Sequence, residues 1–460
     1  METKAVYFVG IGGIGMSAIA RYFISQGVVV AGYDRTPSDL TGQLAKEGAL
    51  VHYEDSVDLI PAPCRDKEST LVVYTPAIHP SEHAELAFFL HQGFEVQKRA
   101  QVLGMLTRNY KALCVAGTHG KTTTSSMAAH LLHQSHLDCN AFLGGITKNY
   151  GTNYILSRES PFVVIEADEF DRSFHYLTPF ASVITATDAD HLDIYGTEEA
   201  YLESFSKYSS LIRPGGFLIM HAGLRMRPDV QEGVTVHTYS RGEEGDFHAE
   251  NVCIGDGRIT FDLVSPLGNI RGIDLGVPVS VNIENGIAAM ALAQIAGATS
   301  DEIRQGMASF SGVERRFDFH VRTDRMVFLS DYAHHPEEIR RCLESLRELY
   351  RDRRIKAIFQ PHLYSRTRDF YRDFADALSV LDDVCVVDIY PAREEPIPGV
   401  TSQLIYDSLR HGIRRQMCRR DEIPDVVRQG GFDVLVTLGA GDIEDYVPQI
   451  TEILLHEDSV

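Results

Sequence analysis

Residues 116–124 read Ala-Gly-Thr-His-Gly-Lys-Thr-Thr-Thr. The apolar run Ala112–Val115 precedes this stretch, and a helical pattern at 125–134 follows it. Strand, glycine turn, Lys-Thr and helix are the layout of a loop whose backbone N–H groups bind phosphate oxygens. The spacing is the short form G-x-x-G-K-T, because Val115 stands where the longer pattern has its first glycine. We predict a nucleotide-phosphate loop, with an ordinary glycine turn as the alternative.

Lys121 and Thr122 give this loop its expected chemistry. Lys121 would reach the β- and γ-phosphates of a nucleotide, and Thr122 could place its hydroxyl on Mg²⁺. Further along, the apolar run Phe162–Ile165 leads into Glu166 and the acidic stretch 166–171. A carboxylate at a strand end beside a phosphate loop is typical of the Mg²⁺ sites of NTPases. We therefore predict that Glu166 holds Mg²⁺, with a solvated acidic turn as the alternative.

A second metal ligand is expected after the strand 181–187. His191 lies there among Asp188, Asp190 and Asp193. A histidine with carboxylates after a central strand is a donor set for a metal ion. Two metal ions also suit phosphoryl transfer. The alternative is that His191 is structural.

The N-terminal region carries another glycine turn. Gly10-Ile11-Gly12-Gly13-Ile14-Gly15 follows the strand Val6–Val9 and precedes a helical pattern, and Asp34 ends a second strand. This is the fingerprint G-x-G-x-x-G with an acidic residue about 20 residues on. It predicts a nucleotide diphosphate at the helix N-terminus and a ribose hydroxyl at Asp34, with a purely structural turn as the alternative. Thr75 follows the strand Leu71–Tyr74, at the edge where α/β sheets bind ligands.

Polar residues also end the strands expected in the C-terminal region. These strands are 326–330, 355–360, 384–389 and 434–438. Their polar ends are the expected active edge of a parallel sheet. His334 and His335 with Arg366 and Arg368 could bind a carboxylate there, with helix caps and surface residues as the alternative. Arg316 is one of two adjacent arginines, 315 and 316. It could bind a phosphate or be surface charge, and the sequence leaves both open.

The composition is that of a globular protein, with 44% hydrophobic and 23% charged residues. A net charge of −21 argues against a nucleic-acid partner. The seven cysteines are scattered without a C-x-x-C motif, which suits a reducing cytosol. The uncharged segment 5–20 is broken by glycines, and no other apolar run is long enough to span a bilayer. We expect a cytoplasmic protein, monomer or homodimer, without membrane insertion.

Alternating strands, turns and helices predict an α/β fold of three domains, which the length allows. Residues 1–107 are expected to form a Rossmann-like N-terminal domain. Residues 108–317 would form a central P-loop ATPase-type α/β domain, in which 217–276 alternates short strands and glycine turns. Residues 318–460 would form a C-terminal Rossmann-like α/β domain. A linker is expected at 107–110, between the first two domains.

The ordered set of motifs resembles the Mur ligases of peptidoglycan synthesis, over essentially the whole chain. The resemblance rests on these stretches, in chain order: 10–15, 117–122, 166–169, 190–191, 331–336, 359–362, 365–369 and 392–399. It implies an ATP-dependent C–N ligase that joins L-alanine to the lactyl carboxylate of UDP-N-acetylmuramate through an acyl phosphate, releasing ADP and phosphate. ATP would be a co-substrate, and two Mg²⁺ ions the expected cofactors. Positive charge at Lys121 and Mg²⁺ would let the two anionic substrates meet.

The resemblance also implies which residues form the sites. The UDP-sugar would contact Gly12, Gly13, Gly15, Asp34, Thr75 and Ala77. ATP would contact Gly117, Thr118, His119, Gly120, Lys121, Thr122, Thr123, Asn282, Asn285, Arg316 and Asp331. L-Alanine would contact Tyr332, His334, His362 and Arg366, and the metal ligands would be Thr122, Glu166 and His191. The catalytic residues would be Lys121, His191 and His334, with either histidine taking the amine proton.

Three other functions are weighed against this one. A ligase that recycles UDP-N-acetylmuramate with a whole peptide is a rival within the family, and the stretch His362–Arg368 argues against it. An NAD-dependent dehydrogenase built on the first glycine turn would leave Lys121, Glu166 and the third domain without a role. A non-enzymatic ATP switch would leave the polar stretches 331–336 and 362–369 unexplained.

Overall fold

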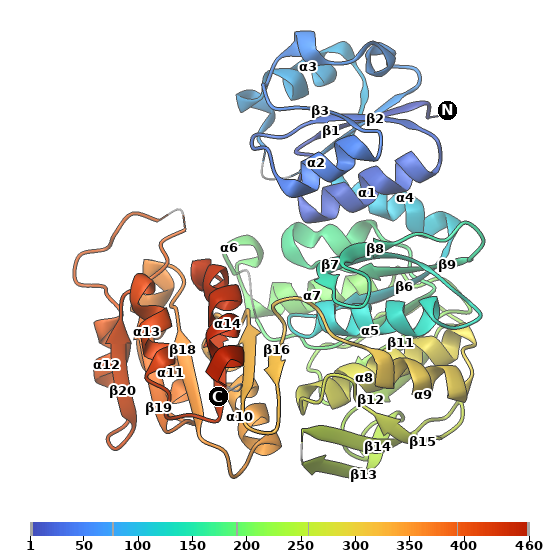
Figure 1. The fold of residues 1–460 in the computed structure, drawn as a ribbon. Helices are drawn as coiled ribbons and strands as arrows, with labels where there is room; N and C mark the ends of the chain where they lie inside the picture. Colours follow the sequence, from blue (N-terminus) through green and yellow to red (C-terminus); the bar gives the residue numbers. More distant parts are fainter. Residues whose placement is uncertain (1–2, 76–77, 190–191, 256, 393, 458–460) are drawn as a thin grey trace. The chain divides into compact units, whose positions relative to one another are not determined.

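The computed structural model describes residues 3–75, 78–189, 192–255, 257–392 and 394–457. They form four β-sheets with helices packed against them (Figure 1). The chain divides into two compact units, one of Met1–Glu250, Leu263–Arg271 and Glu284–Ser309, the other of Asn251–Asp262, Gly272–Ile283 and Phe310–Val460. No helix within the described ranges combines the length and apolar composition needed to cross a bilayer.

The first sheet is parallel and has the strand order β3-β2-β1-β4-β5. Its strands are β1 (Ala5–Val9), β2 (Val29–Tyr33), β3 (Leu50–His52), β4 (Thr70–Tyr74) and β5 (Glu95–Lys98). Its helices are α1 (Ile14–Ser25), α2 (Asp39–Lys46), α3 (Ala84–Gln92) and α4 (Arg99–Asn109). The expected strands and the expected helix after the glycine turn are confirmed, whereas the short strand β3 was not foreseen.

Alternating side chains of β1 explain why both faces of this sheet are covered. Val6 and Phe8 belong to a core with residues of α1, α2 and α4. Tyr7 and Val9 belong to another core, which contains Leu86 and Phe89 of α3. Helix α3 lies on the face of the sheet opposite to α1 and α2 (Figure 1). A strand buried on both faces reads as a continuous apolar run, and this is the reason that Val6–Val9 was recognisable in the sequence.

The linker expected at 107–110 is wrong. Helix α4 continues to Asn109, and only Tyr110 separates it from β6 at Lys111. Thr107 is buried. Its hydroxyl accepts a hydrogen bond of 3.0 Å from the N–H of Thr178, and its carbonyl accepts one from Arg213. Thr107, which suggested a linker because it is polar, therefore lies in a helix and accepts hydrogen bonds from residues far along the chain.

The second sheet has the order β12-β11-β10-β6-β9-β7-β8 and is parallel except for the pair β7–β8. Its strands are β6 (Lys111–Ala116), β7 (Asn140–Thr147), β8 (Thr152–Ile155), β9 (Phe162–Glu166), β10 (Ala181–Ile184), β11 (Phe217–His221) and β12 (Thr235–Tyr239). The associated helices are α5 (Lys121–His133), α6 (Leu192–Tyr195), α7 (Glu198–Ser209), α8 (Val281–Ala296) and α9 (Ser300–Ser309). β6 lies between β9 and β10, so the residues that follow these three strands gather at one edge of the sheet.

A small third sheet contains β13 (His248–Gly255), β14 (Arg258–Val264) and β15 (Ile270–Asp274). Together with β11 and β12 it confirms the expectation of short strands between 217 and 276. The boundary between the two compact units runs through this sheet.

The fourth sheet has the order β16-β17-β21-β18-β19-β20, and only the pair β16–β17 is antiparallel. Its strands are β16 (Asp318–Arg322), β17 (Val327–Asp331), β18 (Ile355–Phe359), β19 (Asp383–Val387), β20 (Arg414–Cys418) and β21 (Val434–Leu438). The helices are α10 (Pro336–Leu349), α11 (Tyr364–Leu378), α12 (Gln403–Ser408), α13 (Ile423–Arg428) and α14 (Val447–Glu457). α13 and α14 share a core with one face of the sheet. On the other face, Phe359 of β18 contacts Phe374 of α11.

Short 3₁₀ helices complete the secondary structure: Val57–Leu59, Ala62–Arg65, Pro80–Glu82, Phe170–Tyr176, Arg420–Glu422 and Asp442–Tyr446. One expected helix begins at another residue than predicted, because the helix expected at 125–134 starts four residues earlier, at Lys121.

Candidate nucleotide and substrate sites

The phosphate loop connects β6 to α5, and two of its glycines have positive φ angles. Gly117 has a φ of 134° and Gly120 a φ of 81°, conformations that side chains with a Cβ rarely adopt. A Cβ on Gly120 would lie 2.7 Å from Oδ1 of Asn285, so another chain segment also requires glycine there. The N–H of Thr118 donates to the carbonyl of Ala186, at 3.0 Å. The loop is therefore held against the end of β10, with the N-terminus of α5 open to a ligand.

Lys121 forms a buried ion pair that the sequence did not predict. Its Nζ lies 2.8 Å from Oε2 of Glu169 and donates to the carbonyl of Gly117 at 2.6 Å. Glu169 is only 2% exposed. Burial raises the pKa of Glu169, and the charge of Lys121 opposes that shift. In the sequence Glu169 was one acid among several; a buried carboxylate facing Lys121 could only be found from the fold.

Thr122 and Glu166 meet at the start of α5 and the end of β9, as the sequence predicted. The Thr122 hydroxyl donates to Oε1 of Glu166 at 3.1 Å, and the N–H of Gly144 donates to Oε2 at 3.0 Å. A hydroxyl and a carboxylate are oxygen ligands of the kind that Mg²⁺ prefers. The pair therefore fits a Mg²⁺ ion. His191, the third expected metal ligand and an expected catalytic residue, lies outside the described residues.

The other expected ATP residues fall into two groups. Thr118, His119, Thr123 and Asn285 belong to the same compact unit as Lys121. The Thr118 hydroxyl bonds the carbonyl of Asp188 at 2.8 Å, and the Thr124 hydroxyl donates to Oδ1 of Asn285 at 3.2 Å. His119 lies 3.8 Å from the Asp188 carboxylate.

Asn282, Arg316 and Asp331 belong to the second compact unit. Asn282 is buried and donates to the carbonyl of Val277 at 3.2 Å. The Asp331 carboxylate accepts backbone N–H bonds from Phe317 and Ala333, both at 2.7 Å. Burial raises the pKa of Asp331 to about 6, against the opposing charge of Arg316.

The first glycine turn is closed by the acid that the fingerprint singles out. Oδ2 of Asp34 accepts the N–H of Gly12 at 2.7 Å, and Oδ1 accepts the N–H of Thr36 at 3.2 Å. A Cβ on Gly12 would lie 2.7 Å from Cγ2 of Thr41, so the turn is tightly packed. Asp34 thus holds the turn together as well as standing at the strand end where a ribose is expected. Ala77 lies outside the described residues.

A cavity of about 370 Å³ joins the first glycine turn to the acidic end of β9. Its lining includes Gly13, Gly15 and Thr75 from the first turn and strand edge, and Glu166 from β9. Arg99, at the start of α4, also lines it, and a Cβ on Gly15 would lie 2.7 Å from the Nη1 atom of Arg99. Its guanidinium is 3.8 Å from Asp168. Arg99 was missed because nothing in its local sequence connects it to the glycine turn.

The residues expected at the amino-acid end come together in the second unit. The rings of Tyr332 and His334 lie 5.2 Å apart, and those of His334 and His362 lie 6.0 Å apart. Burial is the main cause that lowers the pKa of His334 and of His362, the latter to about 4, and the charge of Arg366 adds to both shifts. Both imidazoles are therefore neutral near pH 7. Among the residues that the structure describes, Nδ1 of His362 and Nη1 of Arg366 are buried polar atoms without a hydrogen-bond partner.

Two neighbours of this group have structural roles instead. His335 precedes α10, where its N–H and that of His334 donate to Glu338. Arg368 is exposed and pairs with Asp369 at 2.7 Å. For these two residues the alternative of helix cap and surface charge is confirmed.

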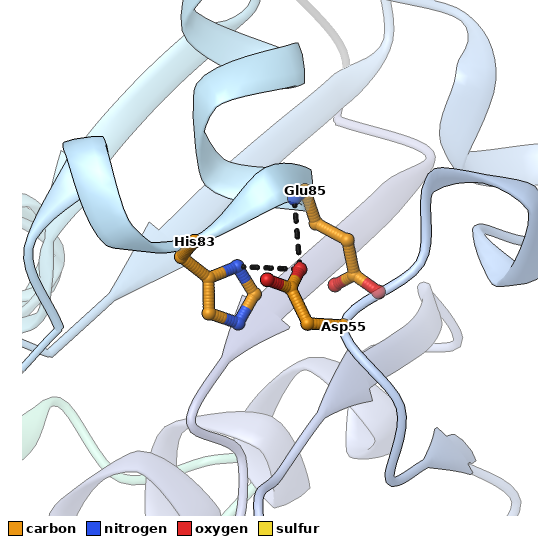
Figure 2. A group of neighbouring side chains, drawn as sticks. All are labelled: Asp55, His83 and Glu85. Carbon is orange, nitrogen blue, oxygen red and sulfur yellow. Dashed lines mark hydrogen bonds and ion pairs between the residues drawn. The ribbon is translucent and has the colours of Figure 1, made fainter.

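A separate polar cluster lies in the first sheet, where Asp55, His83 and Glu85 face one another (Figure 2). Asp55 accepts the N–H groups of Ala84 at 2.7 Å and Glu85 at 3.0 Å, and it lies 3.0 Å from Nδ1 of His83. Oε2 of Glu85 accepts the hydroxyl of Tyr7 at 2.6 Å. The oxygens that would coordinate a metal are thus already bonded, and the cluster caps α3 against β1.

Two glycine turns at strand–helix junctions, one with Lys-Thr and a nearby carboxylate, define a nucleotide-binding α/β enzyme of the phosphate-loop type. Family models sharpen this. The Mur ligase family catalytic domain matches residues 5–111, the Mur ligase middle domain 115–293, and the Mur ligase glutamate ligase domain 315–441. The chain belongs to the Mur ligase family.

Similar proteins cover the whole chain. A UDP-N-acetylmuramate–L-alanine ligase of Phocaeicola vulgatus is 66% identical over 98% of each chain. One of Parabacteroides distasonis is 58% identical over 98% of each. Among solved structures, the UDP-N-acetylmuramate-alanine ligase of Thermotoga maritima has a TM-score of 0.80 at 28% identity, covering 98% of this chain and 99% of that one. A murein peptide ligase of Psychrobacter arcticus has a TM-score of 0.64 at 21% identity, covering 98% of each chain, and shares the fold.

Proposed function

We propose that the protein joins L-alanine to the lactyl carboxylate of UDP-N-acetylmuramate in peptidoglycan precursor synthesis, consuming ATP and releasing ADP and phosphate. The observation that carries this proposal is the cavity that runs from the first glycine turn to Glu166, whose carboxylate accepts the hydroxyl of Thr122 from the phosphate loop. Full-length relatives bearing the name of this ligase, at 66% and 58% identity, support the same activity.

ATP activates the lactyl carboxylate by phosphorylating it, because a free carboxylate does not react with an amine at neutral pH. Two anions must then approach each other, and positive charge between them lowers the barrier. Lys121 supplies this charge at the mouth of the phosphate loop. In the free protein Glu169 neutralises it, so the γ-phosphate takes over a partner that a carboxylate holds beforehand. The loop N–H groups from Gly117 to Thr123 orient the remaining phosphates.

Thr122 and Glu166 would hold a Mg²⁺ ion, and His191 a second one. When bound, such ions withdraw negative charge from the phosphoryl oxygens. The chain's own contribution is to fix the Thr122 hydroxyl and the Glu166 carboxylate 3.1 Å apart, with Gly144 orienting the second carboxylate oxygen. Asn282, Asn285, Arg316 and Asp331 are proposed to complete the ATP site.

The UDP-sugar would bind along the cavity of the first unit. The turn at Gly12, Gly13 and Gly15 offers backbone N–H groups at the N-terminus of α1 to the diphosphate. Arg99 lines the same cavity and would bind the diphosphate with its guanidinium. Asp34 is proposed to lie near the uridine, and Thr75 and Ala77 along the sugar nucleotide.

L-Alanine would bind among Tyr332, His334, His362 and Arg366. A buried guanidinium nitrogen without a partner, on Arg366, suits the carboxylate of an amino acid. The neutral imidazoles of His334 and His362 can accept hydrogen bonds from its amino group, and a proton must leave that amine before it attacks the acyl phosphate. His334 or His191 is proposed to take this proton.

Several further expectations are part of the proposal. They are the domain bounds 1–107, 108–317 and 318–460, a cytoplasmic location, and a monomer or homodimer. The family models, which end at residue 111 and begin again at 115 and 315, support bounds near these positions.

Phosphate release with UDP-N-acetylmuramate and ATP tests the activity directly. We expect turnover with L-alanine, measured beside L-serine, glycine and an L-Ala-D-Glu-containing tripeptide. Turnover with the tripeptide but not with L-alanine would establish the recycling ligase instead. A change in nicotinamide absorbance without ATP consumption would establish a dehydrogenase.

A further inference from the structure

Two cysteines lie in contact inside the fourth sheet. Sγ of Cys385 is 3.3 Å from Sγ of Cys418, and the two thiols form a hydrogen bond. Both cysteines are free and buried. This pair takes no part in the sites described above.

The pair is set by the register of two parallel strands. β19 and β20 align Cys385 with Gln416 and Val387 with Cys418, so the cysteines are diagonal neighbours. Both side chains belong to the core beneath α13 and α14, and so point to the same face of the sheet. Diagonal neighbours on one face are further apart than directly opposed residues, and here the two short side chains turn toward each other. The short distance between the sulfurs is therefore built into the register.

A buried lysine from the next strand adds positive charge. Lys356 of β18 is 3% exposed, and its Nζ lies 3.8 Å from Oδ1 of Asp383. Its charge acts to lower the pKa of both thiols, whereas burial raises both, and the carboxylates of Asp383 at Cys385 and of Asp388 and Glu422 at Cys418 also oppose it. The hydrogen bond between the thiols divides them: it raises the pKa of Cys385, the donor, and lowers that of Cys418, the acceptor. A second thiol in contact is what resolves a sulfenic acid to a disulfide.

We propose that Cys385 and Cys418 are a redox modification site that closes to an intramolecular disulfide under a peroxide oxidant. The Cys418 thiolate attacks one oxygen of hydrogen peroxide, forming a sulfenic acid and releasing hydroxide, which takes up the thiol proton as water. The Cys385 sulfur then attacks the sulfenic sulfur, and a second water leaves. The balance is two thiols and one peroxide giving one disulfide and two waters.

The position of the pair connects it to the amino-acid end of the same unit. Three residues after β19, Tyr390 stacks on His362, with the ring centroids 5.7 Å apart. Its backbone bonds Pro361 at 2.8 Å and Leu363 at 2.9 Å. The disulfide would join β20 to β19, the strand that leads to Tyr390 and its contact with His362.

The test is peptide mapping of the full-length protein after exposure to hydrogen peroxide, without reduction. A Cys253→Ser background removes the exposed thiol that could join two molecules. We expect a peptide linked between residues 385 and 418, lighter by two hydrogens than the separate thiol peptides, which dithiothreitol reverses. Cys139→Ser, a buried cysteine of the first unit, is the matched control and should form the link at the same rate.

Cys385→Ser and Cys418→Ser should each abolish the link. In Cys385→Ser the remaining Cys418 should proceed to sulfinic acid, because no second thiol resolves it. If Cys385→Ser or Cys418→Ser fails to fold, the measurement on the Cys253→Ser protein still decides, because that protein keeps both thiols of the pair. Irreversible oxidation of Cys418 in that background without the 385–418 link, or no loss of either thiol while the other cysteines react, would overturn the proposal.

Discussion

The two glycine turns of the first compact unit have the same layout but neutralise their positive ends in different ways. At the first turn a carboxylate binds the backbone, because Asp34 accepts the N–H of Gly12 at 2.7 Å. At the second turn a carboxylate binds a side chain, because Glu169 pairs with Lys121 at 2.8 Å. The first arrangement fixes the backbone of a turn, and the second holds a side-chain cation that a phosphate would take over in the proposed function. Two glycine turns at strand–helix junctions can therefore differ in what the nearby carboxylate holds, which is the backbone in one and a lysine side chain in the other.

The largest expected effect comes from removing the cation of the second turn. Lys121→Ala should lower kcat about 10³-fold, since a preorganised charge at the reacting phosphoryl group is lost. KM for UDP-N-acetylmuramate should stay within about twofold, because the first turn is unchanged. Steady-state phosphate release measures both, with exposed Lys67→Ala as control. Equal losses in both variants would contradict the comparison.

Removing the counter-charge tests whether Glu169 restrains Lys121. Glu169→Gln leaves a buried ammonium without its carboxylate, so the free protein should lose about 3 kcal/mol of unfolding free energy. ATP should bind several-fold more tightly, because it no longer displaces an anion. Denaturant unfolding and calorimetric titration measure the two effects. Weaker ATP binding would show that Glu169 assists the ligand instead of competing with it.

Arg99 is a cationic side chain that lines the cavity beside the first turn. Arg99→Gln should raise KM for UDP-N-acetylmuramate about tenfold, the size of one charge-assisted hydrogen bond to a phosphate. KM for ATP should change little. Arg108→Gln, an exposed arginine on the same helix, is the matched control. If both KM values rose together in Arg99→Gln, the separation of the two turns would fail.

A smaller effect is expected at another buried acid, Glu85 of α3. Glu85 faces Tyr7 and His52, and burial raises its pKa from 4.5 to about 7. The folded state then binds this proton more tightly than the unfolded state, so stability falls as pH rises from about 4.5 through 7. Glu85→Gln should flatten the dependence of Tm on pH across this range by a few degrees. Thermal unfolding from pH 5 to 8 measures this dependence. If Tm changed with pH in Glu85→Gln as it does in the parent protein, Glu85 would not be the source of the pH dependence.

Most of the fold could be predicted because its signals are local. The runs Val6–Val9 and Ala112–Val115 are buried strands, and a glycine turn follows each at the predicted residues. β3 was missed because it is three residues long and only partly buried. The linker at 107–110 was wrong because its polar side chains bond residues far along the chain, such as Thr178.

Contacts between candidate site residues could be predicted in two cases only. Either one motif contains both residues of the contact, or the two residues lie at the ends of neighbouring strands. Thr122 and Glu166 follow neighbouring strands, β6 and β9, and their contact at 3.1 Å is what a parallel sheet implies. Arg99 and Glu169 were missed because each acts on a residue from a different element. Burial decides the role of Glu169, and burial depends on the whole fold.

Helix α4 passes from the first sheet to the second with a single residue, Tyr110, before β6 begins. Its last turn is tied down through Thr107 by Thr178 and Arg213. The two glycine turns, proposed to bind the sugar nucleotide and the triphosphate, thus belong to one compact unit that this anchored helix connects. The distance between the phosphoryl donor, ATP, and the carboxylate that accepts the phosphoryl group would then be set by the fold. The bound ligands would have less to contribute to that distance.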